Sequence, residues 1–236
     1  MEEVSCYIHH SPHMKHPTPA PPAPAETEAK PEAEPRWPAI LAVLAAAALE
    51  FVLPEPFSFG PDWLLPVVVG LLMIPTVLSY RVGHLELNRV LSHVMMAVLT
   101  ASMVWSLYSL IVRLPAHRDT PQELLRAAAT LWVANILVFA SWYWRLDAGG
   151  PNERDLRPSH TNGAFLFPQM TMSGKQARAW RPGFIDYLFL AFNTSTAFSP
   201  TDVPVLSRWA KMMMIVQASI SLATVALIAA RAVNIL

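Results

Sequence analysis

The residues best suited to chemistry lie in one short stretch near the C-terminus, where side chains carrying oxygen atoms follow one another closely. The stretch contains Asn193, Thr194, Ser195, Thr196, Phe198, Ser199, Thr201 and Asp202. Hydroxyl groups followed by a carboxylate are suited to a cation, because rings of oxygen dipoles and acidic side chains select cations in channels. The pattern therefore favours ion coordination or ion passage.

Two apolar segments must position this stretch. The first begins at Phe184, after Pro182-Gly183, and has Asp186 in its first turn, where a carboxylate complements the helix dipole. We expect this short helix to break at Asn193 into a non-helical run. A long apolar helix follows from about Ser207. Such an order is typical of a pore loop, since non-helical backbone persists at membrane depth only inside protein or beside water.

The composition indicates a membrane protein. Of 236 residues, 53% are hydrophobic and 14% are charged, and several uncharged runs are long enough for a helix to cross a bilayer, which takes about 20 residues. The basic and acidic residues balance at 17 each, so no nucleic-acid partner is expected. Cys6 is the only cysteine, which excludes an intrachain disulfide. The polar N-terminus does not resemble a cleaved signal peptide.

The apolar runs predict an all-α polytopic transmembrane helix bundle with five full spans and a short re-entrant helix before the last span. The spans are expected at 37–53, 63–80, 90–112, 127–144 and 212–230. In the last span, Gln217, Ser221 and Thr224 are candidates for lining a pore. In the fourth, Asn135 is expected to bond to a neighbouring helix. Glu50 lies near the end of the first span, and we expect its carboxylate to reach the interface.

The chain divides into four parts. We expect a disordered, Pro/Ala-rich cytoplasmic tail at 1–36, a four-helix transmembrane region at 37–145, a cytoplasmic loop at 146–182 and the pore-loop-like module at 183–236. Basic residues set the orientation: nine flank the spans on the side of the tail and three on the other side. This places the N-terminus in the cytoplasm.

The start of the last span adds a further constraint on which side of the membrane each segment lies. Arg208 and Lys211 also favour the cytoplasmic side, although four spans have already returned the chain there. Both conditions hold if 184–204 enters the membrane and comes back. A short true span and an interfacial helix are the two alternatives.

The C-terminal residues carry two resemblances. The run Thr194-Ser-Thr-Ala-Phe-Ser-Pro-Thr-Asp202, followed by Pro204 and a helix, resembles the pore loop and inner helix of two-helix potassium channels. Thr196, Phe198 and Asp202 correspond to the threonine, aromatic and acidic residues of that filter. Ala197 and Ser199-Pro200 replace its glycines. The last 55 or so residues, ending in Ala232-Val-Asn234, are similar to an uncharacterised family of bacterial integral membrane proteins.

These features lead to one function and one alternative. The first is cation permeation by a homo-oligomer in the plasma membrane, with a monovalent cation and membrane lipid as partners and Asp202 at the pore mouth. The alternative is a non-catalytic structural or regulatory membrane protein in which 184–204 is only a connecting turn. No catalytic motif is present, so we expect neither an enzyme nor a cofactor or metal centre. No internal repeat indicates a transporter.

Overall fold

The computed structural model describes residues 33–113, 119–157, 160, 162–173, 180–199 and 202–235, with the backbone alone from 231. In this part of the chain the regular structure is helical, apart from one antiparallel bridge between Phe165 and Val205. The longer helices are α1 (Trp37–Ala48), α2 (Leu64–Val82), α3 (Leu85–Arg113), α4 (Pro121–Leu146), α7 (Phe184–Thr196) and α8 (Arg208–Ile235). The shorter ones are η1 (Leu49–Phe51), η2 (Glu55–Phe57), η4 (Asp147–Gly149), α5 (Pro151–Asp155) and η5 (Pro168–Thr171).

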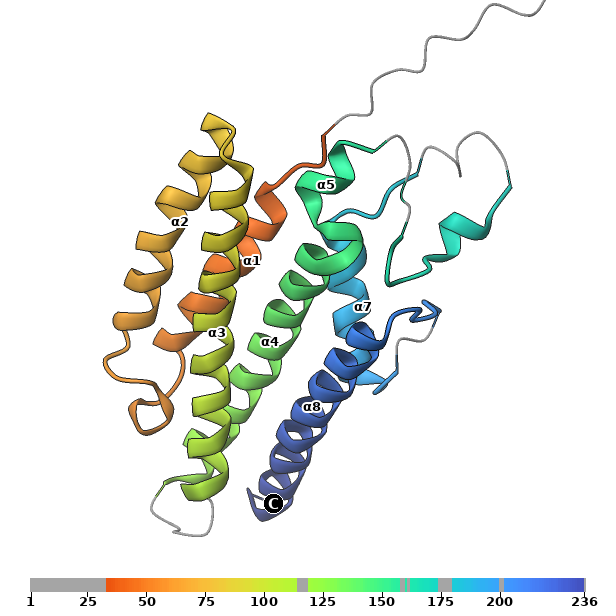
Figure 1. The fold of residues 1–236 in the computed structure, drawn as a ribbon. Coiled ribbons are helices and arrows are strands. Elements are labelled where there is room, and N and C mark those ends of the chain that lie inside the picture. Colours follow the sequence, from red (N-terminus) through yellow and green to blue (C-terminus); the bar gives the residue numbers. More distant parts are fainter. Residues whose placement is uncertain are drawn as a thin grey trace, which may run out of the picture. The chain divides into compact units, whose positions relative to one another are not determined.

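Helix α4 is the centre of the bundle. It packs against α1 and α3 on one side and against α7 and α8 on the other, while α2 packs on α3 and α1 (Figure 1). Its own sequence explains why it forms. Thr120 is the N-cap, its hydroxyl accepts a hydrogen bond from the Glu123 N–H, and the Glu123 carboxylate accepts one from the Thr120 N–H. This capping box starts α4, and its apolar run carries it through the core.

Four of these helices are long and apolar enough to cross a membrane: α2, α3, the α4–η4 segment and α8. The fifth expected span, at 37–53, is not confirmed. The apolar helix Trp37–Phe51 is shorter than a span, and the extended residue Pro54 follows soon after it. A proline disfavours helical backbone in the residue before it, so the sequence cannot continue this helix.

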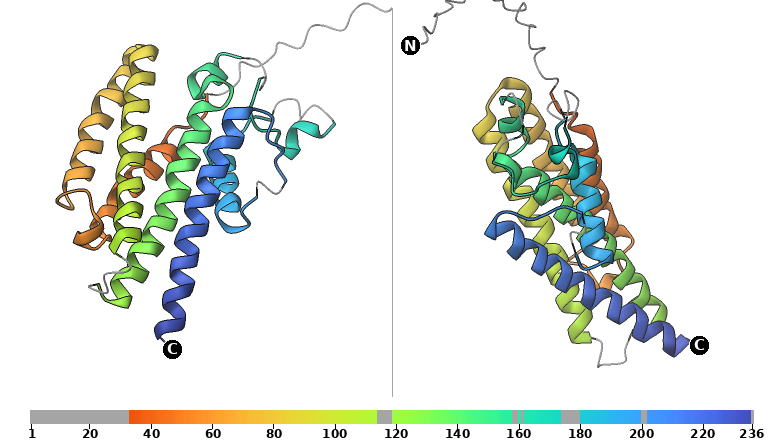
Figure 2. Two further views of the ribbon diagram at one scale, coloured as in Figure 1. Left: turned by 60° about the horizontal axis from the view of Figure 1, so that its bottom comes forward. Right: turned by 90° about the vertical axis from the view of Figure 1, so that its right-hand side faces the viewer.

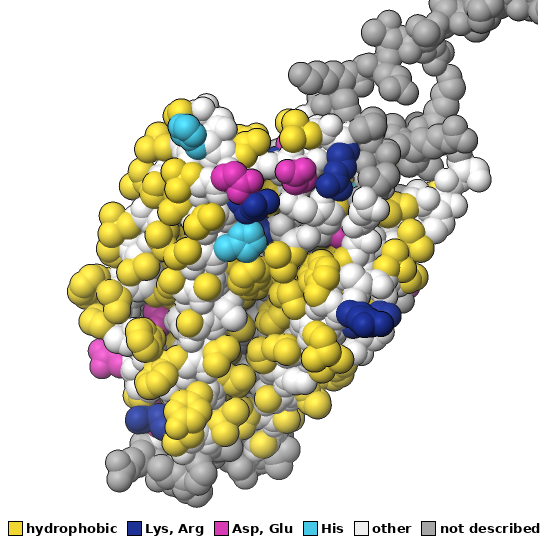
Figure 3. All heavy atoms as spheres, in the orientation of Figure 1, with side chains coloured by type: hydrophobic (Ala, Val, Ile, Leu, Met, Phe, Trp, Pro, Cys, Tyr) yellow, Lys and Arg dark blue, Asp and Glu magenta, His cyan; other side chains and the backbone are white. Residues whose placement is uncertain are grey.

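Three segments far apart in the sequence meet at one end of the bundle. Arg36, just before α1, contacts Asn152 and Asp155 of α5, and Asn152 in turn donates to Asn88 at the start of α3. The residues before α1, the α2–α3 turn and the connection after α4 therefore lie together, as the alternation of spans predicts. On the face in Figure 3, charged and histidine side chains gather at this end and hydrophobic side chains cover the middle.

Helices α7 and α8 both run away from that end. Phe184, the first residue of α7, stacks on Trp144 near the end of α4, and Trp209 at the start of α8 stacks on Phe165. Figures 1 and 2 show α7 ending partway along the bundle, whereas α8 continues to the opposite end. The 13 residues of α7 extend about 20 Å. That is less than the hydrocarbon core of a bilayer, about 30 Å.

Candidate functional site

The predicted break at Asn193 is wrong, because α7 continues to Thr196. The hydroxyls expected to interrupt the helix instead bond to it. Thr194 Oγ1 donates to the Leu190 carbonyl at 2.8 Å, and Thr196 Oγ1 donates to the Phe192 carbonyl at 2.9 Å. Threonine hydroxyls can return to the carbonyl four residues earlier, and in apolar surroundings this satisfies them without ending the helix.

A buried polar cluster holds the end of α7 between α4 and α8. Gln217 Nε2 donates to Ser195 Oγ at 3.0 Å and to the Ala191 carbonyl at 2.8 Å. Tyr143 OH donates to Gln217 Oε1 at 2.5 Å. Ser221 Oγ donates to the Ser195 carbonyl at 2.6 Å. Because every bond joins two different helices, the cluster fixes how deep α7 sits.

Asn135 brings the middle of α4 into the same cluster. Its Nδ2 lies 3.2 Å from the Gln217 carbonyl and 3.4 Å from Ser195 Oγ. The prediction that Asn135 bonds to a neighbouring helix is thus confirmed. Gln217, Ser221 and Thr224, the candidates from the last span, are all 0% exposed and lie inside the bundle of this one chain. Among the described residues, Thr224 bonds only to carbonyls of α8 itself.

The remaining residues of the polar stretch are on the outside. Thr196, Phe198, Ser199 and Asp202 are exposed and Asn193 is half-buried, while Thr201 lies outside the described residues. Phe198 has a φ of 53°, in the left-handed region that costs a residue with a Cβ roughly 1–2 kcal/mol. The turn that ends α7 thus combines exposed polar groups with strained backbone.

After this turn the chain runs back to the connection that follows α4. The Leu206 N–H donates to the Ala164 carbonyl at 2.8 Å, and the Leu166 N–H donates to the Pro204 carbonyl at 3.0 Å. These bonds flank the bridge between Phe165 and Val205. The segment 203–206 is therefore tied to the connection that follows α4, and α8 starts from there.

Asp147 anchors that connection to both α4 and α7. This fully buried carboxylate accepts hydrogen bonds from the Ala164 N–H at 2.5 Å and from Tyr187 OH on α7 at 2.6 Å, and His160 Nε2 lies 3.2 Å away. Sequence reasoning did not single out Asp147. The one sequence feature that could have indicated Asp147 is its position as the first acidic residue after the aromatic run Trp142-Tyr143-Trp144.

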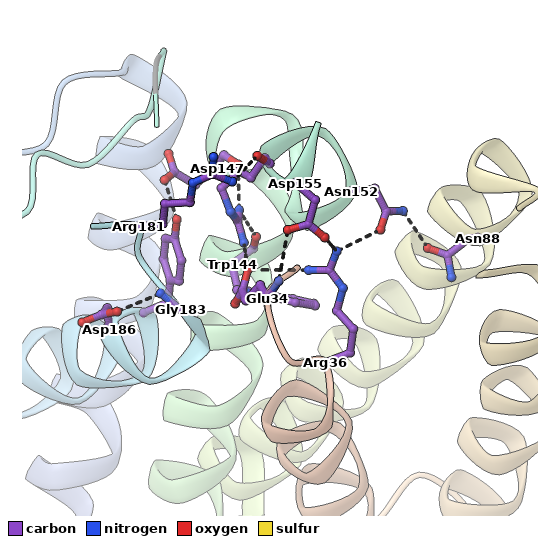
Figure 4. Close-up of polar contacts among 12 residues, drawn as sticks. Glu34, Arg36, Asn88, Trp144, Asp147, Asn152, Asp155, Arg181, Gly183 and Asp186 are labelled. Atoms are coloured by element: carbon purple, nitrogen blue, oxygen red, sulfur yellow. Dashed lines mark hydrogen bonds and ion pairs between the residues drawn. The ribbon is translucent and has the colours of Figure 1, made fainter. Parts of the chain in front are cut away.

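Figure 4 shows a second polar group, around Glu34, Arg36 and Trp144. Arg154 is 5% exposed, and its Nη2 lies 2.9 Å from Glu34 Oε2. Its Nη1 donates to the carbonyls of Trp144 and Asp147. Glu34 Oε1 accepts from Trp144 Nε1 at 2.5 Å. Residues 34 and 36 belong to the expected disordered tail, yet both are fixed by these contacts; residues 1–32 of the tail lie outside the described part.

The start of α7 lies beside this group. The Gly183 N–H donates to the Asp186 carboxylate at 2.8 Å, which caps the helix as its sequence predicts. Burial, together with the negative charge of Glu34, raises the pKa of the Asp186 carboxyl, against the opposing effect of the Gly183 hydrogen bond. The capping carboxylate therefore titrates above its ordinary range.

Glu50 differs from the expectation that it reaches the interface. Its side chain is buried, with Oε1 accepting from the Phe59 N–H at 3.2 Å and Oε2 lying 3.4 Å from Ser102 Oγ. The segment after η1 folds back over it, which the prolines that follow did not reveal. Within the described residues, no group of three or more His, Cys, Asp or Glu side chains could hold a metal ion.

Comparison with models of protein families, with curated proteins and with solved structures finds no match for this chain. The site must therefore be interpreted from its own geometry. Two features define it: the buried cluster that fixes α7, and the exposed turn at the end of α7.

Proposed function

We propose that this chain is one subunit of a cation-permeable assembly in the plasma membrane, and that 184–206 is its re-entrant pore loop. The observation that carries the proposal is the position of the α7 end. Ser195 lies beside Asn135, near the middle of α4, and the chain then turns back to pair with Phe165. α7 thus enters the bundle and leaves it by the same end.

Exposure of the turn supports an oligomer. Polar backbone outside a helix is costly in hydrocarbon unless protein covers it or water reaches it. In a single chain Thr196, Phe198 and Ser199 are exposed at the depth of the α7 end. Neighbouring copies and a shared aqueous pathway would meet both requirements.

The two groups of polar residues then have separate roles. Gln217, Ser221 and Thr224, together with Ser195, hold α7 in place within each chain. The exposed Thr196 hydroxyl and the Asp202 carboxylate face the pathway, where oxygen ligands and negative charge favour a monovalent cation. The negative end of the α7 dipole points the same way.

The orientation follows from charge. The end of the bundle that holds Arg36, Arg81, Arg89, Arg145 and Arg154 carries more basic residues than the end near Arg113 and Arg126. Basic residues flanking membrane helices favour the cytoplasm, which supports a cytoplasmic position for the α7 entry and for the segment before α1. In the potassium channels that the stretch resembles, the loop enters from the outer side, so the present chain is an inverted arrangement.

The decisive experiment is potassium flux into lipid vesicles that contain the purified chain. Asp202→Asn should lower the flux or change its selectivity, whereas Glu86→Gln, an exposed acid on α3, should not. No flux from folded protein over a range of voltage and pH would reject permeation. The 184–206 segment would then be a connecting turn in a structural or regulatory membrane protein.

A second test addresses the oligomer. Cys6 is the only cysteine, so a Cys6→Ser background allows a single new thiol to be placed. Thr196→Cys should form disulfide-linked dimers under mild oxidation, and Ser219→Cys on the exposed side of α8 serves as the control. Equal cross-linking at both positions would contradict a shared pathway at the α7 end.

A further inference from the structure

A basic cavity opens at the end of the bundle where α1, α2, α3 and α4 meet, away from the α7 turn. Its volume is about 220 Å³. Three arginines line it, Arg36, Arg81 and Arg145, and no acidic residue is among the described residues that line it. Arg36 is paired with Asp155, but Arg81 and Arg145 have no carboxylate partner in the described chain. The cavity is therefore suited to an anion.

Unused hydrogen-bond donors point to the same kind of ligand. Arg145 Nε and Ser92 Oγ are buried and have no hydrogen-bond partner among the described residues, and both residues line the cavity. Ser92 is only 1% exposed, so its hydroxyl has no alternative in solvent. Buried donors are costly to leave unsatisfied. A phosphate group, with several acceptor oxygens, would satisfy both and would pair with the guanidinium groups.

A groove next to the basic cavity indicates which kind of phosphate compound would fit there. An apolar groove of about 740 Å³ runs along the outer side of α1 and α2, lined by residues such as Leu44, Leu71 and Ile74. It shares Met73, Val77 and Arg81 with the basic cavity. The two hollows are thus adjacent, so a ligand with an anionic group in the cavity could lay an apolar chain in the groove.

The aromatic residues place this site at the level of lipid headgroups. Tyr80 and Trp144 line the cavity, and the Arg36 guanidinium lies 5.6 Å from each ring centre. Tyrosine and tryptophan concentrate at membrane–water interfaces. Basic pockets between membrane helices on the cytoplasmic side bind acidic lipid headgroups.

We propose that this cavity binds the phosphate of an anionic phospholipid, with one acyl chain lying in the groove along α1 and α2. A free phosphate ion would occupy only the basic cavity and would leave the groove without a role. Gly70 lines this groove, and a Cβ added there would meet nothing within 4 Å. A larger side chain at that position would project into the groove, because the place of its Cβ is open space.

Native mass spectrometry of the full chain in non-ionic detergent tests the proposal. The protein is mixed with equal amounts of phosphatidylglycerol and phosphatidylcholine that have identical acyl chains. We expect preferential retention of one phosphatidylglycerol per chain. Arg81→Gln should weaken its binding about fivefold, the effect of one basic residue near an anionic headgroup. Arg89→Gln, an exposed arginine at the same end that does not line the cavity, is the matched control and should leave binding unchanged.

Gly70→Leu separates the lipid from a free anion. It should reduce retention of phosphatidylglycerol, while added inorganic phosphate should not displace the lipid from the wild-type chain. Equal retention of the two lipids, or equal losses in Arg81→Gln and Arg89→Gln, would overturn the proposal. Displacement by inorganic phosphate, with no effect of Gly70→Leu, would overturn it in favour of a simple phosphate site. Circular dichroism confirms that each variant is folded.

Discussion

Ser195 Oγ on α7 lies 3.0 Å from Gln217 Nε2 on α8, and Asn135 of α4 reaches both residues. Three helices therefore exchange hydrogen bonds at one depth. Interhelical hydrogen bonds between membrane helices are individually modest, but they are specific in position. This cluster explains how a helix of 13 residues keeps a fixed depth between two much longer helices.

Gln217→Leu should destabilise the bundle by about 1–2 kcal/mol, because Tyr143, Ser195 and the Ala191 carbonyl each lose a partner. Equilibrium unfolding in mixed micelles of non-ionic detergent and sodium dodecyl sulfate, followed by circular dichroism, measures the change. Ser219→Ala is the matched control, since within the described part of the chain this exposed hydroxyl bonds only to the Ile215 carbonyl of its own helix. Similar losses in both variants would show that the cluster has no special part in stability.

The backbone conformation of Phe198 predicts a substitution that does not lower the free energy of unfolding. Phe198→Gly should leave the free energy of unfolding unchanged or raise it by up to about 1 kcal/mol, because glycine adopts a positive φ without strain. Ala197→Gly should lower it by about 0.5–1 kcal/mol, because Ala197 has an ordinary φ of −94° and glycine only adds freedom to the unfolded chain. The same micelle titration compares the two. A loss at both positions would mean that the Phe198 side chain itself stabilises the turn.

Arg154 should be the most sensitive residue in the polar group around Glu34 and Arg36. Arg154→Gln removes one of the two arginine partners of the half-buried Glu34 carboxylate, which keeps Arg36, and leaves two main-chain carbonyls without a donor, so we expect a loss of about 1–3 kcal/mol. Glu86→Gln breaks the exposed pair with Arg89 and should cost about 0–1 kcal/mol. Thermal unfolding in detergent ranks the variants. An Arg154→Gln protein as stable as Glu86→Gln would rule out this group as a structural centre.

The capping carboxylate Asp186 predicts a dependence on pH. Its pKa in the folded chain is raised above the ordinary 3.8, chiefly by burial. The stability that it contributes is therefore present in full below that ordinary value and is lost as the pH rises through the raised pKa. Relative to Asp186→Asn, the wild-type chain should become less stable over this interval. Unfolding titrations of both proteins at a series of pH values measure the difference, and a constant difference would contradict the raised pKa.

The sequence predicts the helices better than it predicts the site. Long uncharged runs give α2, α3, α4 and α8 directly, and a lone Asn135 in such a run indicates a bond to a neighbour. The extent of α7 was not predictable in the same way. Threonine and serine disfavour helix interiors in water, but here their hydroxyls bond to the preceding turn or to α8, and the break moves beyond Thr196.

Long-range contacts account for the other differences. Glu50 and Asp147 look like carboxylates near the ends of spans, which ordinarily reach water. Each is buried because a later segment covers it: Phe59 folds back over Glu50, and Ala164 and Tyr187 close over Asp147. The partners lie between 9 and 40 residues away in sequence. No local sequence pattern indicates that a distant segment will cover these carboxylates.

The segment before α1 and the end of α8 lie at opposite ends of the bundle, and this separation affects which soluble proteins can reach them. The segment before α1 lies with α5 and the α2–α3 turn, whereas α8 carries the chain to the other end of the bundle (Figures 1 and 2). Since α7 turns back, it does not change this separation. If the four long helices cross a membrane, a soluble kinase, protease or adaptor confined to one side of it would meet either residues 33–36 and α5 or the end of α8, but not both on the same molecule.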